Sequence, residues 1–118
     1  MKPNNFFFTL ILIASCNTSN IKVEEKQLEG KWNFTRTLRN DKETQTTNSA
    51  FIVFHPDKSV TSNLFQVEEN KTFTLHENKI KINGGESYEW TITEFAGDSM
   101  KLEGKMYSFD MQMYLKKE

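Results

Sequence analysis

The 118-residue sequence contains a single cysteine, Cys16, so no disulfide bond can form within the chain. It has only two prolines, Pro3 and Pro56, and no stretch rich in glycine or proline that would join two domains. We find no internal repeat. A chain of this length is sufficient for one domain with its own core, and we expect one domain.

Neither sign of charge is in excess, since 15 Lys and Arg stand against 16 Asp and Glu and the formal net charge is -1 at pH 7. The two signs are interspersed, and no basic stripe of the kind that binds a phosphate backbone is present. We therefore expect no nucleic-acid partner. The aromatic content, in contrast, is high, with 10 Phe, 3 Tyr and 2 Trp, which favours a compact core over a disordered chain.

Residues that carry catalysis or metal chemistry are sparse. His55 and His76 are the only histidines, and neither has a second histidine or a cysteine at ligand spacing. The sequence contains no Gly-x-Ser-x-Gly motif, phosphate-binding loop or dinucleotide fingerprint. Adjacent acidic residues such as Glu68 and Glu69 would point to opposite faces of a strand, so they could not act together as acid and base. The sequence therefore predicts a protein that is not an enzyme, with no metal and no cofactor.

Residues 1–15 differ in kind from the rest of the chain. Lys2 supplies a positive start, residues 6–13 form an apolar run with one threonine, and Ala14 and Ser15 are small. These are the three parts of a secretory signal peptide. The run of about 8 residues is far shorter than the roughly 20 that span a bilayer as a helix. We therefore expect a signal peptide over residues 1–15.

Cys16 directly follows Ile13-Ala14-Ser15, and this order resembles the bacterial lipobox. The resemblance implies a lipoprotein of the bacterial cell envelope, held at the lipid bilayer by acyl chains such as palmitate on Cys16. Stable anchoring generally takes at least two lipid groups. The alternative, an ordinary secretory signal with a free thiol, would bring a reactive group into an oxidising compartment. Asn17 is not the aspartate that retains some lipoproteins at the inner membrane, which favours the outer membrane.

Residues 16–27 are predicted to form a flexible tether between the lipid anchor and the domain. Small polar residues follow the cysteine, and Ile21 and Val23 are the only apolar side chains before Leu28. Such a composition offers no apolar face to bury. We expect the folded domain to cover residues 28–116.

The domain alternates apolar and polar residues with a period of two, the pattern of half-buried strands. In residues 28–38 this places Trp32, Phe34 and Leu38 on one face, together with the charged Arg36. Further strands are expected at a spacing of roughly ten residues. We predict an all-β fold, an eight-stranded antiparallel up-and-down barrel, with a two-sheet β-sandwich as the alternative. The other predicted strands cover residues 50–55, 60–67, 72–76, 79–83, 87–95, 100–102 and 107–115.

Gly30-Lys31-Trp32, at the start of this all-β segment, resembles the Gly-x-Trp opening of the lipocalin-like families. The strand that runs into Pro56, the strand with Tyr88 and Trp90, and the aromatic last strand are also similar to bacterial lipocalin-like domains. The resemblance covers about residues 28–115 and implies a barrel. It also implies an interior able to hold one small apolar or amphipathic molecule.

Eight residues expected to face this interior form the candidate ligand site. Arg36 is charged, so it either reaches water or an aromatic ring from an open end of the barrel, or orients an anionic headgroup at the mouth of a pocket. The thioether of Met111 could equally fill a gap in the core or line an adaptable pocket. The eight candidates are Trp32, Phe34, Arg36, Tyr88, Trp90, Tyr107, Phe109 and Met111.

Two functions remain open at this point. The first is a membrane-anchored lipocalin-like lipoprotein that binds a small hydrophobic or amphipathic ligand in the cell envelope. An eight-stranded barrel is only just wide enough for its own side chains or one small ligand, so the interior could instead be filled. The second function is therefore a filled barrel that binds an envelope protein, or inhibits an enzyme, through loop residues 39–48.

Overall fold

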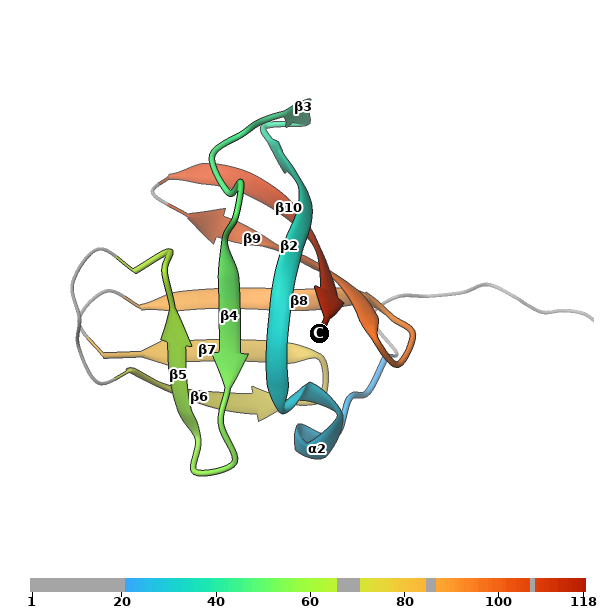
Figure 1. Ribbon diagram of the computed structural model, residues 1–118, viewed down its shortest axis with the longest axis vertical. Coiled ribbons are helices and arrows are strands. Elements are labelled where there is room, and N and C mark those ends of the chain that lie inside the picture. Colours follow the sequence, from blue (N-terminus) through green and yellow to red (C-terminus); the bar gives the residue numbers. More distant parts are fainter. Residues whose placement is uncertain (1–20, 66–70, 85–86, 107) are drawn as a thin grey trace, which may run out of the picture.

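The computed structural model describes residues 21–65, 71–84, 87–106 and 108–118 (Figure 1). The predicted signal peptide, the lipidation site Cys16 and the candidate site residue Tyr107 lie outside these described residues. Within them, none of the helices has the length and apolar character needed to cross a membrane.

Eight antiparallel strands form a closed barrel, because the last strand pairs with the first. Every other barrel strand is hydrogen-bonded to its neighbours along the chain. This closure confirms the predicted all-β, up-and-down barrel and decides against the sandwich. A ninth strand, β3 (Lys42–Glu43), pairs only with the end of the first. The barrel strands are β2 (Gly30–Arg39), β4 (Phe51–Phe54), β5 (Ser59–Ser62), β6 (Lys71–His76), β7 (Lys79–Asn83), β8 (Tyr88–Phe95), β9 (Ser99–Met106) and β10 (Phe109–Lys117).

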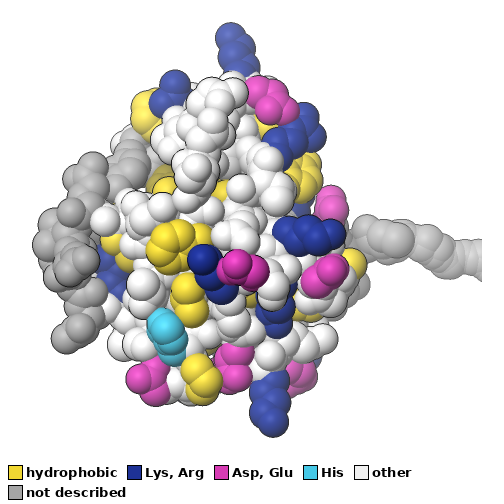
Figure 2. Space-filling model, in the orientation of Figure 1, with side chains coloured by type: hydrophobic (Ala, Val, Ile, Leu, Met, Phe, Trp, Pro, Cys, Tyr) yellow, Lys and Arg dark blue, Asp and Glu magenta, His cyan; other side chains and the backbone are white. Residues whose placement is uncertain are grey.

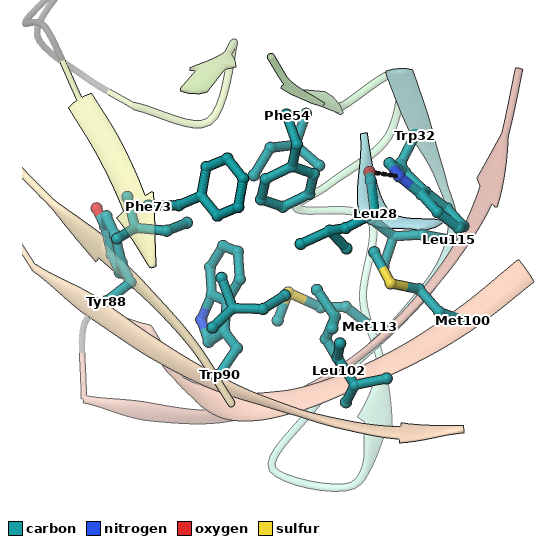
Figure 3. Close-up of a cluster of buried hydrophobic side chains, with 14 of the residues drawn as sticks. Leu28, Trp32, Phe54, Phe73, Tyr88, Trp90, Met100, Leu102, Met113 and Leu115 are labelled. Atoms are coloured by element: carbon teal, nitrogen blue, oxygen red, sulfur yellow. Dashed lines mark hydrogen bonds between the residues drawn. The ribbon is translucent and has the colours of Figure 1, made fainter. Parts of the chain in front are cut away.

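Apolar side chains from all eight strands fill the centre of the barrel (Figure 3). Trp32 and Trp90 are fully buried, and the rings of Phe54 and Phe73 meet edge to face with their centroids 5.0 Å apart. Burying one large apolar side chain stabilises a fold by about 1.5–3 kcal/mol. Side chains therefore occupy the barrel interior that was predicted to hold a ligand.

Gly104 lies inside β9. The indole of Trp90, on the neighbouring strand β8, lies against it. A Cβ on Gly104 would come within 2.6 Å of Cδ1 of Trp90 and 2.7 Å of the carbonyl oxygen of Glu89. Glycine is therefore required at this position so that the ring can approach the backbone of the next strand.

A short helix, α2 (Glu25–Leu28), covers one end of the barrel, which we call the closed end (Figure 1). Leu28 is fully buried, and its carbonyl oxygen accepts a hydrogen bond of 2.8 Å from Nε1 of Trp32 (Figure 3). Nζ of Lys117, on the last strand, donates to the carbonyl oxygen of Gln27 at 2.9 Å. The same Nζ lies 5.2 Å from the ring centroid of Trp32. These contacts tie the helix to both strands that close the barrel.

Residues 23–27, predicted to belong to a flexible tether, dock on the closed end instead. Val23 is 4% exposed, and its backbone N–H donates to the carbonyl oxygen of Glu77 at 3.1 Å. The carboxylate of Glu25 forms an ion pair of 2.6 Å with Nζ of Lys58. The buried side chain of Val23 and its backbone hydrogen bond to a neighbouring turn thus hold this segment in place. The composition of the segment alone did not predict this.

A β-bulge in β2 turns Arg36 to the outside of the barrel. In the pairing with β10, Phe34 faces Leu115 and Arg36 faces Tyr114, so Thr35 is an extra residue in the ladder. The side chains of Thr35 and Arg36 are both exposed, and Thr37 is buried in their place. The prediction that Arg36 faces inward is wrong, because strict alternation makes no allowance for the extra residue.

Candidate ligand-binding site

The end of the barrel opposite α2, which we call the open end, holds a pocket of about 320 Å³. Part of its lining comes from the last residue of β2, the last residue of β9 and the start of β10, which antiparallel pairing brings together. The rest comes from the loop before β4 and the residues that follow β5. The volume lies at the lower end of the range of about 300–1,000 Å³ for small-molecule pockets. The lining residues are Arg39, Thr46, Thr47, Asn63, Leu64, Met106, Phe109 and Met111.

The apolar part of the pocket is formed largely by two methionines and a phenylalanine. Met106 and Met111 are both buried, so they contribute its inner surface. Phe109 is 37% exposed and lies on the rim, one residue after Ser108, whose φ is 76°. The prediction that Phe109 faces the interior needs correction, because the strand begins at the edge of the barrel. Flexible thioethers beside a partly exposed ring form an adaptable apolar surface.

Hydrogen bonds hold the wall of the pocket in place. Oδ1 of Asn63 accepts from the backbone N–H of Phe51 at 2.9 Å, and its Nδ2 donates to the carbonyl oxygen of Ser49 at 3.0 Å. The hydroxyls of Thr37 and Thr47 are hydrogen-bonded to each other, and both residues are buried. The loop between β3 and β4 is therefore fixed to the barrel at two points, through Asn63 and through Thr47.

Arg39 is the only ionisable residue among the described residues that line the pocket. Its guanidinium carbon lies 4.7 Å from the ring centroid of Phe109, in a cation–π contact at the rim. Arg39 forms no ion pair with any described residue. Among the described residues, the pocket thus combines an apolar interior with one positive charge, that of Arg39, with which no described carboxylate pairs.

Arg36, the other arginine of the chain, is held in a different way. Its Nε donates to a carboxylate oxygen of Glu43, and its guanidinium lies 5.5 Å from the ring centroid of Tyr114. The hydrogen bond and the charge of Glu43 raise the pKa of the Arg36 guanidinium above its ordinary value. Arg36 lies on the outer surface and does not line the pocket.

Four of the predicted site residues belong to the core rather than to the pocket. Trp32, Phe34 and Trp90 are buried in the main hydrophobic cluster. Tyr88 is buried as well, and its ring stacks on that of Phe65 with the centroids 5.7 Å apart. Of the predicted residues that the structure describes, only Phe109 and Met111 line the pocket.

A second hollow, of about 260 Å³, lies on the side of the barrel near the turn between β8 and β9. Its lining includes Thr35, Phe95 and Tyr114, and none of the predicted ligand-binding residues. The pocket at the open end is larger and contains two of them, so it is the stronger candidate for a ligand site.

Charged side chains of both signs are interspersed on the face of the barrel that Figure 2 shows. Within the described part of the chain, no group of three or more His, Cys, Asp or Glu residues lies close enough together to hold a metal ion. Nε2 of His55 is hydrogen-bonded to the hydroxyl of Thr61 at 2.9 Å.

Sequence reasoning missed the residues that lie where strands end. Arg39 was assigned to a loop, and Met106 lay between the predicted strands 100–102 and 107–115. Asn63 was placed within a strand, although a side chain able to hold a neighbouring loop is more typical of the end of one. Alternation shows which face a side chain occupies, but it does not show how far along the barrel axis that side chain lies.

No protein-family model matches the sequence, and comparisons with curated proteins and with solved structures find no match. The small, closed barrel of eight antiparallel strands is compatible with a lipocalin-like fold. What the pocket can bind therefore has to be inferred from the residues that line it.

Proposed function

We propose that this protein is a lipocalin-like lipoprotein of the bacterial cell envelope that binds a small hydrophobic or amphipathic molecule at the open end of its barrel. The observation that carries the proposal is the pocket of about 320 Å³ with Met106, Met111 and Phe109 in its lining. A concave, largely apolar site with a few fixed polar groups is the usual form of a small-molecule site. Binding requires no catalysis, and we propose none.

The proposed lipid anchor on Cys16 is supported by the lipobox-like sequence before it. Val23 is bound at the closed end, and only four residues separate Cys16 from Ile21, so their Cα atoms lie at most about 18 Å apart. Such a short span favours an orientation in which the closed end lies near the bilayer, proposed to be the outer membrane. The pocket would then open away from the membrane and take its ligand from the aqueous side.

A second candidate function is favoured by the filled interior. Because Trp32, Phe54, Phe73 and Trp90 occupy the centre, most of the barrel serves its own stability. Loop residues 39–48, most of which are exposed, would then form a contact surface for an envelope protein. This candidate needs no small molecule, which makes the two functions separable.

Extraction of small molecules from the protein purified from its own host tests the proposal. Mass spectrometry of the extract should reveal an apolar or amphipathic compound in stoichiometric amount. Thr46→Trp places a large ring at an exposed lining position and should reduce the yield. Gln45→Trp, at an exposed neighbour outside the lining, is the matched control and should not reduce it. An extract without such a compound from the unaltered protein would leave only the interaction function.

A further inference from the structure

We infer that the pocket selects a single-chain amphiphile with an anionic headgroup, such as a free medium-chain carboxylate, and that Arg39 binds the headgroup. This inference rests on the proposed function, because it assigns the chemical class of the ligand to the same pocket. It replaces Arg36, the residue expected from the sequence to orient an anionic group, with the other arginine of β2.

The charge of Arg39 favours an anionic headgroup. Arg39 supplies the only ionisable side chain among the described lining residues, and no described carboxylate lies within ion-pair distance of it. Arg36 provides the comparison, because it lies on the same strand but is paired with Glu43. A cation at the mouth of an apolar pocket attracts an anion and disfavours a cationic ligand.

The guanidinium of Arg39 is held at the rim by an aromatic ring. Its carbon lies over the ring of Phe109, 4.7 Å from the centroid. A contact with one ring leaves guanidinium N–H groups able to donate to a ligand. Two parallel N–H donors match the two oxygens of a carboxylate, which is why arginine is preferred for this recognition. The neighbouring Thr46 adds a hydroxyl to the lining.

The pocket is small. Its volume of about 320 Å³ lies at the lower end of the range of about 300–1,000 Å³ for small-molecule sites. This size favours one short aliphatic tail over the two tails of a phospholipid. Because the tail would contact Met106 and Met111 while the head stays at the rim beside Arg39, the ligand has to carry its charge at one end.

Isothermal titration calorimetry of the full-length chain with Cys16→Ala, which prevents acylation, tests the inference. Three probes share one tail and differ in the head: decanoate, decanol and decyltrimethylammonium. At pH 8, decanoate should bind about tenfold more tightly than decanol, the size of one charge-assisted bidentate contact. Decyltrimethylammonium should bind more weakly than either.

Substitution of the two arginines makes the test specific. Arg39→Gln should weaken decanoate binding about tenfold and leave decanol binding unchanged. Arg39→Lys keeps the charge but loses the paired N–H donors of the guanidinium. Its affinity for decanoate should therefore lie between those of the unaltered protein and Arg39→Gln. Arg36→Gln removes the same charge from the same strand outside the pocket and should bind decanoate like the unaltered protein. Thermal melting of each variant establishes that the substituted protein is folded.

The outcomes distinguish this inference from the proposed function. If decanoate and decanol bind equally well and Arg39→Gln has no effect, the pocket exists but Arg39 does not select the headgroup, and the inference is overturned. An equal loss of decanoate affinity in Arg36→Gln and Arg39→Gln would also overturn it, because the effect would then be one of net charge. If none of the three probes binds, the proposed function fails as well.

Discussion

Nε1 of Trp32 donates a hydrogen bond of 2.8 Å to the carbonyl oxygen of Leu28, and this bond connects the first strand of the barrel to the helix over its closed end. Both residues are fully buried. A buried carbonyl oxygen has given up its hydrogen bonds to water. If its donor is removed, nothing replaces those bonds and the folded state is destabilised. The closed end is therefore structural, while the open end is free to carry a ligand.

Replacing Trp32 with phenylalanine should lower the free energy of unfolding by about 1–3 kcal/mol more than the same change at Trp90. Trp90 is the matched control, because it is equally buried while its Nε1 has no hydrogen-bond partner in the described structure. Both variants lose the same volume, and only Trp32→Phe also leaves the Leu28 carbonyl unpaired. Urea unfolding measures both values. Equal losses would show that the bond contributes nothing.

Gly104→Ala should destabilise the barrel by about 1–3 kcal/mol, the usual cost of forcing atoms into a packed core. The new methyl group would collide with the indole of Trp90 and with the carbonyl oxygen of Glu89, which belongs to the backbone and cannot turn away. In Gly97→Asn, the control, a Cβ meets nothing within 4 Å, and asparagine tolerates the positive φ. A Gly104→Ala protein as stable as the unaltered one would mean that β8 and β9 are not so closely packed.

Asp57 should make the stability of the protein depend on pH in the acid range. The hydroxyl and the backbone N–H of Ser59 donate to Oδ1 of Asp57 at 2.6 and 3.0 Å, and these bonds lower the pKa of the carboxyl below its ordinary value of 3.8. A carboxyl with a lowered pKa stabilises the folded state above about pH 4, and the contribution is lost as the pH falls through the folded-state pKa.

The corresponding measurement is the free energy of unfolding between pH 5 and 2. It should fall less steeply in Asp57→Asn than in the unaltered protein, because the variant has no carboxyl to titrate at this position. Ser59→Ala keeps the carboxyl and removes one donor, so its slope should lie between the two. An unchanged slope in Asp57→Asn would contradict the account of this turn.

Asn63→Ala should weaken ligand binding and cost about 1 kcal/mol of stability, because two hydrogen bonds to the loop before β4 are lost. A looser wall has to be ordered when the ligand binds, which lowers affinity. Asn48→Ala, on the same loop and outside the lining, is the control. Decanol titration and urea unfolding measure the two effects. Unchanged decanol affinity in Asn63→Ala would show that the wall needs no support.

The barrel could be predicted from the sequence because its strands obey a period of two and follow one another at hairpin distance. Trp32 and Trp90 lie where that pattern places them. The pattern could not predict the bulge at Thr35, since an extra residue depends on the register of β10 rather than on local sequence. The orientation of Arg36 was wrong for that reason alone.

The ligand site was only partly predictable. Phe109 and Met111 were identified as apolar residues of the last strand, but their depth in the barrel depends on where β9 and β10 turn. Arg39 and Asn63 come together with them only through the tertiary fold. Such residues carry no local signal, because a polar side chain at the end of a strand looks the same whether it borders a pocket or faces solvent.

The central claim, that the ligand binds at the open end and not in the interior, is tested most directly by the NMR signals of ¹³C-labelled methionine methyl groups during a titration with decanol. Met106 and Met111 line the pocket, whereas Met113 is buried in the core and Met100 lies away from the pocket. The account predicts that the Met106 and Met111 signals shift while those of Met100 and Met113 stay in place. Shifts at Met113 without shifts at Met106 and Met111, or no shift at any methionine, would contradict it.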